Sequence, residues 1–301
     1  MGGHRLHLTC AGRGTPAVVF EAALGASSLS WTLVQPEVAR ITRACAYDRA
    51  GFGWSDAGPM PRTAVVIADE LHTLLHRAAV VPPYVLVGHS FGALVVRVFA
   101  GRHREETAAL VLVDPAHPEE WLEPGDNARR QIERGVRLCR YGAGAARLGI
   151  ARVIAALVSA GALTPARALV GLVSRGGLSR ADEEILAPIW KLPPDARKPL
   201  PRFWTQPKFY EALGSQIASI RESARQAAEV SPEVFRDLPV TVVSAGSSGE
   251  RRAGLHESFA RRSSRGRHVT AAGSGHWVPL DAPAVVVQAI ADAVDDCRRA
   301  P

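Results

Sequence analysis

Short, largely apolar runs alternate with helix-like segments over the first 116 residues of the chain. The runs are AVVFEA (17–22), ACAYD (44–48), YVLVG (84–88) and ALVLVD (109–114). Strands that are separated by helices pair in parallel, because each helix carries the chain back along the sheet. The alternation therefore predicts an α/β fold with a mostly parallel central sheet flanked by helices.

Two of the intervening segments carry a clear helical stripe. Between the second and third runs, Thr63 is positioned to cap a helix whose apolar residues are Ile67, Leu71, Leu74, Leu75 and Ala78. The segment after the third run repeats the same spacing. Both segments are therefore expected to be helices that pack against the sheet.

The alternation stops for about 120 residues and then resumes. The intervening segment is helical in pattern and rich in Ala, Arg, Gly and Pro, and strand patterns return at 239–246 and 267–273. The chain is therefore expected to have three parts: a first core part (1–116), an inserted helical cap (117–235) and a second core part (236–301). The chain also begins at what looks like the second strand of an opening hairpin, so an earlier edge strand is expected to be missing or to precede this start.

Composition and hydropathy pattern indicate a globular protein. A hydrophobic content of 47% is ample for a core, and the longest uncharged apolar runs fall short of the roughly 20 residues of a bilayer span. The first ten residues are too polar for a signal peptide. The four cysteines show no CxxC pair and are expected to be isolated thiols. We expect a cytoplasmic location with no membrane span.

The net charge of +7 comes mostly from scattered arginine pairs. A nucleic-acid groove would concentrate basic residues on one element, with aromatic residues among them. The densest basic stretch, ARRSSRGRH (260–268), lacks those aromatics and is expected to be solvated surface. No nucleic-acid partner is predicted.

The five residues GHSFG lie between a predicted strand and a predicted helix. This forces a very tight turn, in which Gly88 and Gly92 omit Cβ atoms that would clash as strand and helix close on each other. Ser90 would then project above the sheet edge, where it could act as a nucleophile. A serine hydroxyl needs a base to take its proton. The candidate is His276 in GSGHWVPLDAP, between the last predicted strand and the last helix.

These residues resemble the α/β-hydrolase fold family over almost the whole chain. Besides GHSFG and the GHW loop, YDRAGFGWSD (47–56) is similar to that family's D-x-x-G-x-G-x-S turn, and AALGASSLSW (22–31) aligns with its H-G-x-P...W loop. The resemblance implies an oxyanion hole made by the backbone N–H groups of Leu24 and Phe91. Ala22 and Ala23 stand where the family often has His and Gly.

The acid of the expected triad has two candidates. The family usually places it in a G-x-x-D segment after the strand that here reads PVTVVSAG, but the chain has GSSGE, with Glu250 one residue beyond that place. Some branches of the family take the acid from the strand end that follows the nucleophile helix, which is Asp114 here. Both satisfy the order Ser, acid, His. We favour Asp114 over Glu250.

Other residues have a less specific pattern. His72 and His76 have a metal-compatible spacing, but HTLLH lacks the Glu of HExxH, so no metal site is predicted. Asp48 and Asp281 are expected to be structural. The residues that could contact substrate are His89, His117, Trp190 and Trp204, and the cap aromatics Phe203, Phe209 and Tyr210 could line a pocket or hold the cap together.

The resulting expectation is a serine hydrolase, carboxylesterase-like, that cleaves a small or medium apolar ester through an acyl-enzyme on Ser90 without a cofactor. Lactonase, thioesterase, amidase and cofactor-free haloperoxidase activity are alternatives on the same triad. A ligand-binding protein that has lost turnover is the alternative outside the enzymes. Either a monomer or a homodimer fits the sequence.

Overall fold

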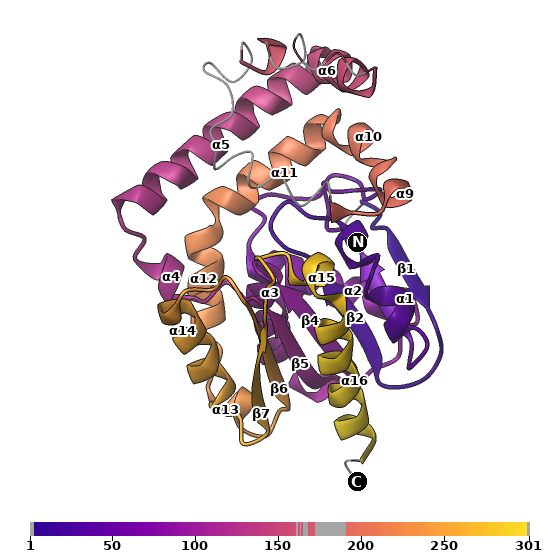
Figure 1. Cartoon of the computed structure of the whole chain (residues 1–301), viewed down its shortest axis with the longest axis vertical. Helices are drawn as coiled ribbons and strands as arrows, with labels where there is room; N and C mark the ends of the chain where they lie inside the picture. Colours follow the sequence, from indigo (N-terminus) through magenta and orange to yellow (C-terminus); the bar gives the residue numbers. More distant parts are fainter. Residues whose placement is uncertain (1–2, 161, 163, 165–167, 172–190, 300–301) are drawn as a thin grey trace.

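The computed structural model describes residues 3–160, 162, 164, 168–171 and 191–299, and over these residues seven strands form one sheet in the order β1-β3-β2-β4-β5-β6-β7 (Figure 1). The strands are β1 (Leu8–Ala11), β2 (Ala17–Glu21), β3 (Ala44–Tyr47), β4 (Tyr84–His89), β5 (Thr107–Val113), β6 (Val240–Ala245) and β7 (Gly266–Ala271). β1 pairs antiparallel with β3, and the other neighbours pair in parallel. The predicted mostly parallel sheet is confirmed.

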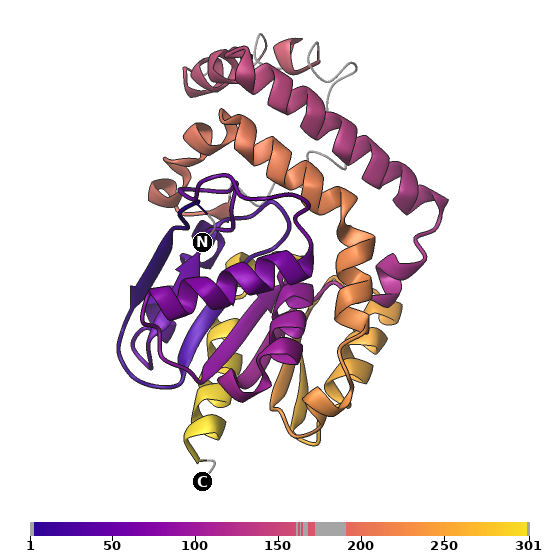
Figure 2. The same ribbon diagram turned by 180° about the vertical axis from the view of Figure 1, so that it is seen from behind.

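Helices cover both faces of this sheet because the strand side chains are apolar on both sides. One face packs against α2 (Ala64–Arg77), α3 (Gly92–Arg102), α12 (Ile220–Ala228) and α14 (Glu250–Ala260), which Figure 2 shows in front of or beside the strands. The other face packs against η1 (Ser28–Trp31), α1 (Gln35–Val38) and α16 (Pro283–Arg299). As predicted, Thr63 caps α2, since its side chain accepts from the Val66 N–H at 3.4 Å.

Helices of the segment between β5 and β6 extend over the carboxyl end of the sheet (Figure 1). They are α4 (Glu119–Leu122), α5 (Asp126–Arg147), α6 (Ile150–Ser159), α9 (Pro194–Arg197), α10 (Leu200–Trp204) and α11 (Pro207–Ala218). The long helices α5 and α11 pack against each other above the core. This places a helical layer over the edge where the strands end.

The last part of the same segment returns to the core, where α12 and α13 (Glu233–Arg236) pack beside α3. The Oγ of Ser223 on α12 accepts from the Ala64 N–H at 3.0 Å, and the side chain of Gln226 accepts from the Val65 N–H at 2.9 Å. Both donors are first-turn groups of α2 that have no partner within their own helix. The segment predicted as cap, 117–235, therefore contains one helix that completes a core helix.

No single helix in the described part of the chain is long and apolar enough to cross a bilayer. Helix α5 and residues Ile150–Val158 meet the length and composition criteria only as a pair, and a bend of 91° separates them.

The expectation that all four cysteines are isolated thiols is wrong for two of them. Cys10 on β1 and Cys45 on β3 form a disulfide, with their Cα atoms 4.1 Å apart. The two residues are direct partners in the antiparallel register, which brings their side chains together on one face. The pairing could not be predicted from the sequence, because the two cysteines are 35 residues apart and β1 is a short strand with no strong pattern of its own.

Candidate active site

Ser90 occupies the tight turn between β4 and α3. Its φ of 53° lies in the left-handed region, which costs a non-glycine residue conformational energy and is held here by the surrounding structure. The Ser90 N–H donates to the carbonyl of Val113 at 3.0 Å. A Cβ on Gly88 would lie 2.8 Å from the backbone of α3, and one on Gly92 would lie 2.5 Å from a carbonyl oxygen of β2. The predicted reason for both glycines is confirmed.

His276 connects Ser90 to Asp114. Its Nε2 lies 3.0 Å from the Ser90 Oγ, and its Nδ1 lies 2.5 Å from the Asp114 Oδ2. The three residues come from the turn after β4, the end of β5 and the loop after β7. Parallel strands present their carboxyl ends at one edge of a sheet, so the topology brings these distant residues together.

Asp114 is buried but well supplied with hydrogen-bond donors. Its Oδ1 accepts from the Ala245 N–H at 3.0 Å and from the Ser248 Oγ at 2.7 Å. Burial alone would raise the pKa of Asp114, but the hydrogen bonds from His276, Ala245 and Ser248 hold that pKa well below its ordinary value. The carboxylate is therefore ionised and oriented toward the imidazole.

Glu250, the second candidate acid, lies elsewhere. Glu250 is the first residue of α14 and is exposed. The His276 ring bonds to Ser90 and Asp114 and not to Glu250. The GSSGE segment instead contributes Ser248, which sequence reasoning did not single out. A sequence signal that could have pointed to Ser248 is its place one residue before position 249, where the G-x-x-D pattern has the acid.

The backbone N–H groups of Leu24 and Phe91 are the predicted oxyanion donors. Over the described residues neither N–H donates to a backbone acceptor outside its own helix or strand, and Leu24 and Phe91 follow the carboxyl ends of β2 and β4 in the chain. Unpaired N–H groups at this edge are available to an oxygen of a bound molecule. The Ala23 carbonyl, on the same peptide unit as the Leu24 N–H, accepts a hydrogen bond from the buried guanidinium of Arg49.

Two aspartates that were expected to be structural hold the flanking loops. Asp48 is buried and accepts from the N–H groups of Ser28 and Trp54, at 2.8 and 3.0 Å. It thereby ties the loop after β2 to the loop after β3. Asp281 accepts from the Gly275 N–H at 2.9 Å, next to His276.

His89, predicted to contact substrate, lies beneath the histidine loop instead. Its side chain is fully buried, its Nε2 donates to the His276 carbonyl at 2.8 Å, and its ring packs edge-on against Trp277. Burial, together with the nearby His276, lowers the pKa of His89 to about 3, so the ring is neutral. This placement suits a role in holding the His276 backbone.

His117 is also buried, with an exposed fraction of 4%. The His117 backbone N–H donates to the Glu120 carboxylate at 2.9 Å, which fixes the start of α4. Burial lowers the pKa of the His117 side chain to about 4. Trp204 packs with Trp277 around an apolar cluster at the base of the cap, close to the histidine loop. Trp190 lies outside the described residues.

Two of the other cap aromatics, Phe203 and Phe209, join the cap to the core. Phe203 packs edge-on against Trp54 at 4.7 Å between ring centroids, and Phe209 packs edge-on against Phe52 at 5.6 Å. Tyr210 instead faces α5, where a Cβ on Gly142 would lie 2.4 Å from its ring. The Phe203 and Phe209 contacts seat the helical layer over the loop after β3, and the Tyr210 contact joins two helices of that layer.

Comparison with known proteins places this arrangement in a family. A family model described as alpha/beta hydrolase fold matches residues 16–283, which includes every strand after β1 and the Ser90, Asp114 and His276 positions. The chain belongs to the α/β-hydrolase fold family. Membership supports an enzyme of hydrolase type and agrees with the fold predicted from the sequence.

Individual relatives of this α/β-hydrolase match more distantly. The chain is 38% identical over 99 residues to the protein named "Uncharacterized protein YqjL" of Bacillus subtilis. This match covers 33% of the chain and 39% of that protein. A thermophilic esterase from Thermogutta terrifontis has a TM-score of 0.67 at 20% identity, covering 98% of this chain and 94% of that one. An enol-lactonase from Burkholderia xenovorans has a TM-score of 0.64 at 18% identity, covering 97% of both chains. At these identities the structural likeness shows the fold alone.

Proposed function

We propose that this α/β-hydrolase is a serine hydrolase that cleaves a carboxylic ester of a small or medium apolar substrate through an acyl-enzyme on Ser90. The observation that carries the proposal is the continuous hydrogen-bonded chain from the Ser90 Oγ through His276 to Asp114, with separations of 3.0 and 2.5 Å. An imidazole in hydrogen-bond reach of a serine, oriented by a carboxylate, is the arrangement that activates a hydroxyl for acyl transfer.

In the first half of the reaction the Ser90 Oγ attacks the ester carbonyl carbon while His276 Nε2 takes the hydroxyl proton. The carbonyl oxygen becomes negative and accepts hydrogen bonds from the N–H groups of Leu24 and Phe91. The C–O bond to the alcohol then breaks, and His276 donates its proton to the leaving oxygen. Asp114 stabilises the imidazolium that exists between these two proton transfers.

In the second half His276 takes a proton from water, and the resulting hydroxide attacks the acyl carbon. The same two N–H groups hold the second tetrahedral oxyanion. The bond to the Ser90 Oγ breaks, the proton returns to Ser90, and the acid product leaves. Apart from the substrate and this water molecule, the groups used in these reaction steps are side chains and backbone atoms of the chain itself.

The preference for an apolar substrate rests on the residues at the base of the cap. Leu200, Phe203, Trp204, Trp277 and Leu280 belong to one apolar cluster, and Trp277 adjoins His276 in the sequence. An acyl or alcohol group that enters between this cluster and Ser90 would contact hydrocarbon and aromatic surface. We expect kcat/KM for p-nitrophenyl butyrate to exceed that for p-nitrophenyl acetate.

Labelling with a fluorophosphonate, followed by intact mass and peptide mapping, tests the proposal. One adduct on the Ser90 peptide is expected, together with hydrolysis of p-nitrophenyl esters. Ser90→Ala should abolish both, whereas Ser247→Ala, which removes an exposed hydroxyl nearby, should retain both. Absence of labelling and of turnover in the folded wild-type protein would contradict the proposal and favour a ligand-binding role.

A further inference from the structure

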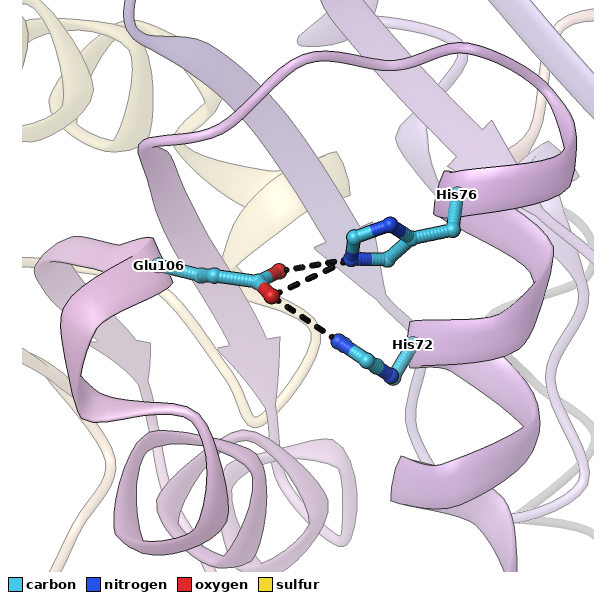
Figure 3. A group of neighbouring side chains, drawn as sticks. All are labelled: His72, His76 and Glu106. Carbon is cyan, nitrogen blue, oxygen red and sulfur yellow. Dashed lines mark hydrogen bonds and ion pairs between the residues drawn. The ribbon is translucent and has the colours of Figure 1, made fainter.

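Two histidines and one glutamate converge on the outer surface of α2. His72 and His76 lie one turn apart on this helix, and Glu106 ends η2 (Arg104–Glu106), the short 3-10 helix before β5. Figure 3 shows both imidazole rings directed at the same carboxylate. The Glu106 Oε1 lies 3.0 Å from His72 Nε2 and 3.1 Å from His76 Nε2, and its Oε2 lies 3.0 Å from His76 Nε2.

These separations are close to those of ligands that share one metal ion. Zn²⁺ binds imidazole nitrogen and carboxylate oxygen at about 2.0–2.2 Å, so neighbouring ligand atoms on a tetrahedral ion lie roughly 3.4 Å apart. One ligand atom from each of His72, His76 and Glu106 lies within 4.8 Å of the others. An ion between them would require the ligand atoms that are farthest apart to approach each other by up to about 1.4 Å. The ion would replace the protons that the two rings now share with Glu106.

Neighbouring contacts hold the three side chains in place before any ion binds. The His72 ring stacks on His103, with the ring planes 4° apart and the centroids separated by 3.6 Å. Asp69, one turn before His72 on α2, accepts from Arg102 of α3 at 2.8 Å. Stacking fixes the His72 ring, and the ion pair fixes α2 relative to the helix that leads into η2. A preorganised ligand set loses less conformational entropy when it binds.

A buried polar atom next to this cluster lacks a partner. Within the described part of the chain, the Nε2 of His103 is inaccessible to solvent and makes no hydrogen bond. Such an atom is uncommon in a folded protein, since an unsatisfied buried polar group costs free energy. His103 is not one of the three residues whose ligand atoms gather, and it supports the cluster by stacking on the His72 ring.

We propose that His72, His76 and Glu106 bind a single Zn²⁺ ion or a divalent transition metal of similar chemistry. Two imidazoles and one carboxylate suit borderline metals, whereas Mg²⁺ and Ca²⁺ prefer oxygen ligands. The side chains of His72 and Glu106 are about one-quarter exposed and that of His76 is half exposed, which leaves room for water as a fourth ligand. HTLLH alone does not predict this site, because Glu106 comes from a different element.

The metal would act on the fold rather than on the hydrolytic chemistry. Glu106 immediately precedes β5 and Asp114 immediately follows it, and a seven-residue strand spans about 23 Å. The two sites therefore lie at opposite ends of the strands, the proposed metal site at the amino end of β5 and Asp114 at its carboxyl end. An ion at the first site would tie α2 to the start of β5 and stabilise the folded state, because the ligands come together only on folding.

Calorimetric titration of EDTA-treated, desalted protein with ZnCl₂ tests the proposal directly. One ion per chain is expected, with no binding of MgCl₂ at the same concentrations. Saturating Zn²⁺ should raise the Tm of the wild-type protein by a few degrees. Absence of Zn²⁺ binding to folded protein would overturn the proposal.

Matched variants locate the site. Glu106→Gln and His76→Gln should each weaken Zn²⁺ binding by at least about tenfold and remove the rise in Tm. Glu105→Gln, which changes an exposed neighbour on the same 3-10 helix, should bind Zn²⁺ as the wild type does. Equal affinity in Glu105→Gln and Glu106→Gln would place any bound ion elsewhere and overturn the proposal, as would equal affinity in His76→Gln and wild type.

Discussion

The guanidinium of Arg49 donates to the carbonyl oxygen of Ala23, on the same peptide unit as the Leu24 N–H. A peptide unit is planar, so a contact that fixes its oxygen also fixes the direction of its N–H. Arg49 is itself held, since its Cζ lies 5.5 Å from the ring centroid of Phe52 and 5.4 Å from that of Phe91. The loop that lacks the family's usual glycine at position 23 is thus oriented from below by a buried cation.

We expect Arg49→Lys to lower kcat for p-nitrophenyl butyrate by about 10- to 100-fold with a smaller change in KM, because oxyanion donors act mainly in the transition state. Steady-state kinetics measures the two parameters separately. Arg62→Lys is the matched control: Arg62 is equally buried and pairs with Glu70 at 2.5 Å, away from the Ala23 carbonyl. An equal loss of kcat in both variants would indicate general loosening of the core rather than positioning of Leu24.

Replacement of the two candidate acids separates their roles. Asp114→Asn removes the charge that orients and stabilises the His276 imidazolium, and kcat should fall by up to about 10⁴-fold. Glu250→Gln changes an exposed residue and should leave kcat within about twofold, as surface substitutions usually do. Esterase assays at neutral pH, with Tm measured in parallel, check this. The reverse pattern would assign the acid to Glu250.

The candidate nucleophile, the candidate base and the positions of the strands after β1 could be predicted because their signals are local. GHSFG and GSGHW each occupy one turn between two elements, and an apolar run of five or six residues suffices to predict a strand. The choice between Asp114 and Glu250 could not be settled in this way. It depends on how the loop after β6 folds back, which turns Ser248 toward Asp114 and leaves Glu250 in solvent.

Ser248→Ala tests the contribution of that loop. A hydrogen bond to a charged group contributes about 1.5–3 kcal/mol to stability. Its loss should also lower kcat, because Asp114 is then less firmly oriented toward His276. The pKa of Asp114 should rise toward its ordinary value, so the loss should grow as the pH is lowered. A pH–rate profile measures both effects. Ser247→Ala removes the adjacent hydroxyl, which does not bond to Asp114, and should show neither effect.

Contacts between elements distant in the sequence were not predictable from pattern alone. Cys10 and Cys45 meet only because β1 pairs with β3, and Glu106 reaches His72 only because α3 packs on α2. Cys10, Cys45 and Glu106 have no distinctive pattern within their own segments. Packing and strand register decide which side chains meet. The pattern of residues in a single sequence reveals neither of them in atomic detail.

Glu21 gives the folded protein a pH-dependent stability. Burial raises the pKa of Glu21 to about 7, although Arg49 and the Tyr47 hydroxyl oppose the shift. In the unfolded chain the carboxyl titrates near about 4.3. Between these values the unfolded chain has released a proton that the folded chain retains, so the contribution of Glu21 to the free energy of unfolding falls as the pH rises.

We expect the wild type to lose stability relative to Glu21→Gln between about pH 4.5 and 7, by a few kcal/mol at most. Urea unfolding of both proteins at pH 5 and pH 7.5 measures the difference. Glu257→Gln, which replaces an exposed carboxylate on α14, should follow the wild type. Identical pH dependence in Glu21→Gln and wild type would show that Glu21 titrates normally in the folded protein.

The Cys10–Cys45 disulfide closes a loop of 35 residues and should stabilise the protein by limiting the unfolded chain. The chain-entropy relation gives about 4 kcal/mol as the upper end for such a loop. The Cys10→Ser/Cys45→Ser double variant should therefore unfold at lower urea, while Cys297→Ser, which removes a free thiol, should not. Activity should persist in the double variant, because β1 is an edge strand and Ser90 follows the central strand β4.

Disulfides are rare in the cytosol, so the cytoplasmic location expected from the sequence predicts four free thiols in protein alkylated before isolation from its host. Two protected thiols would point to an oxidising compartment instead.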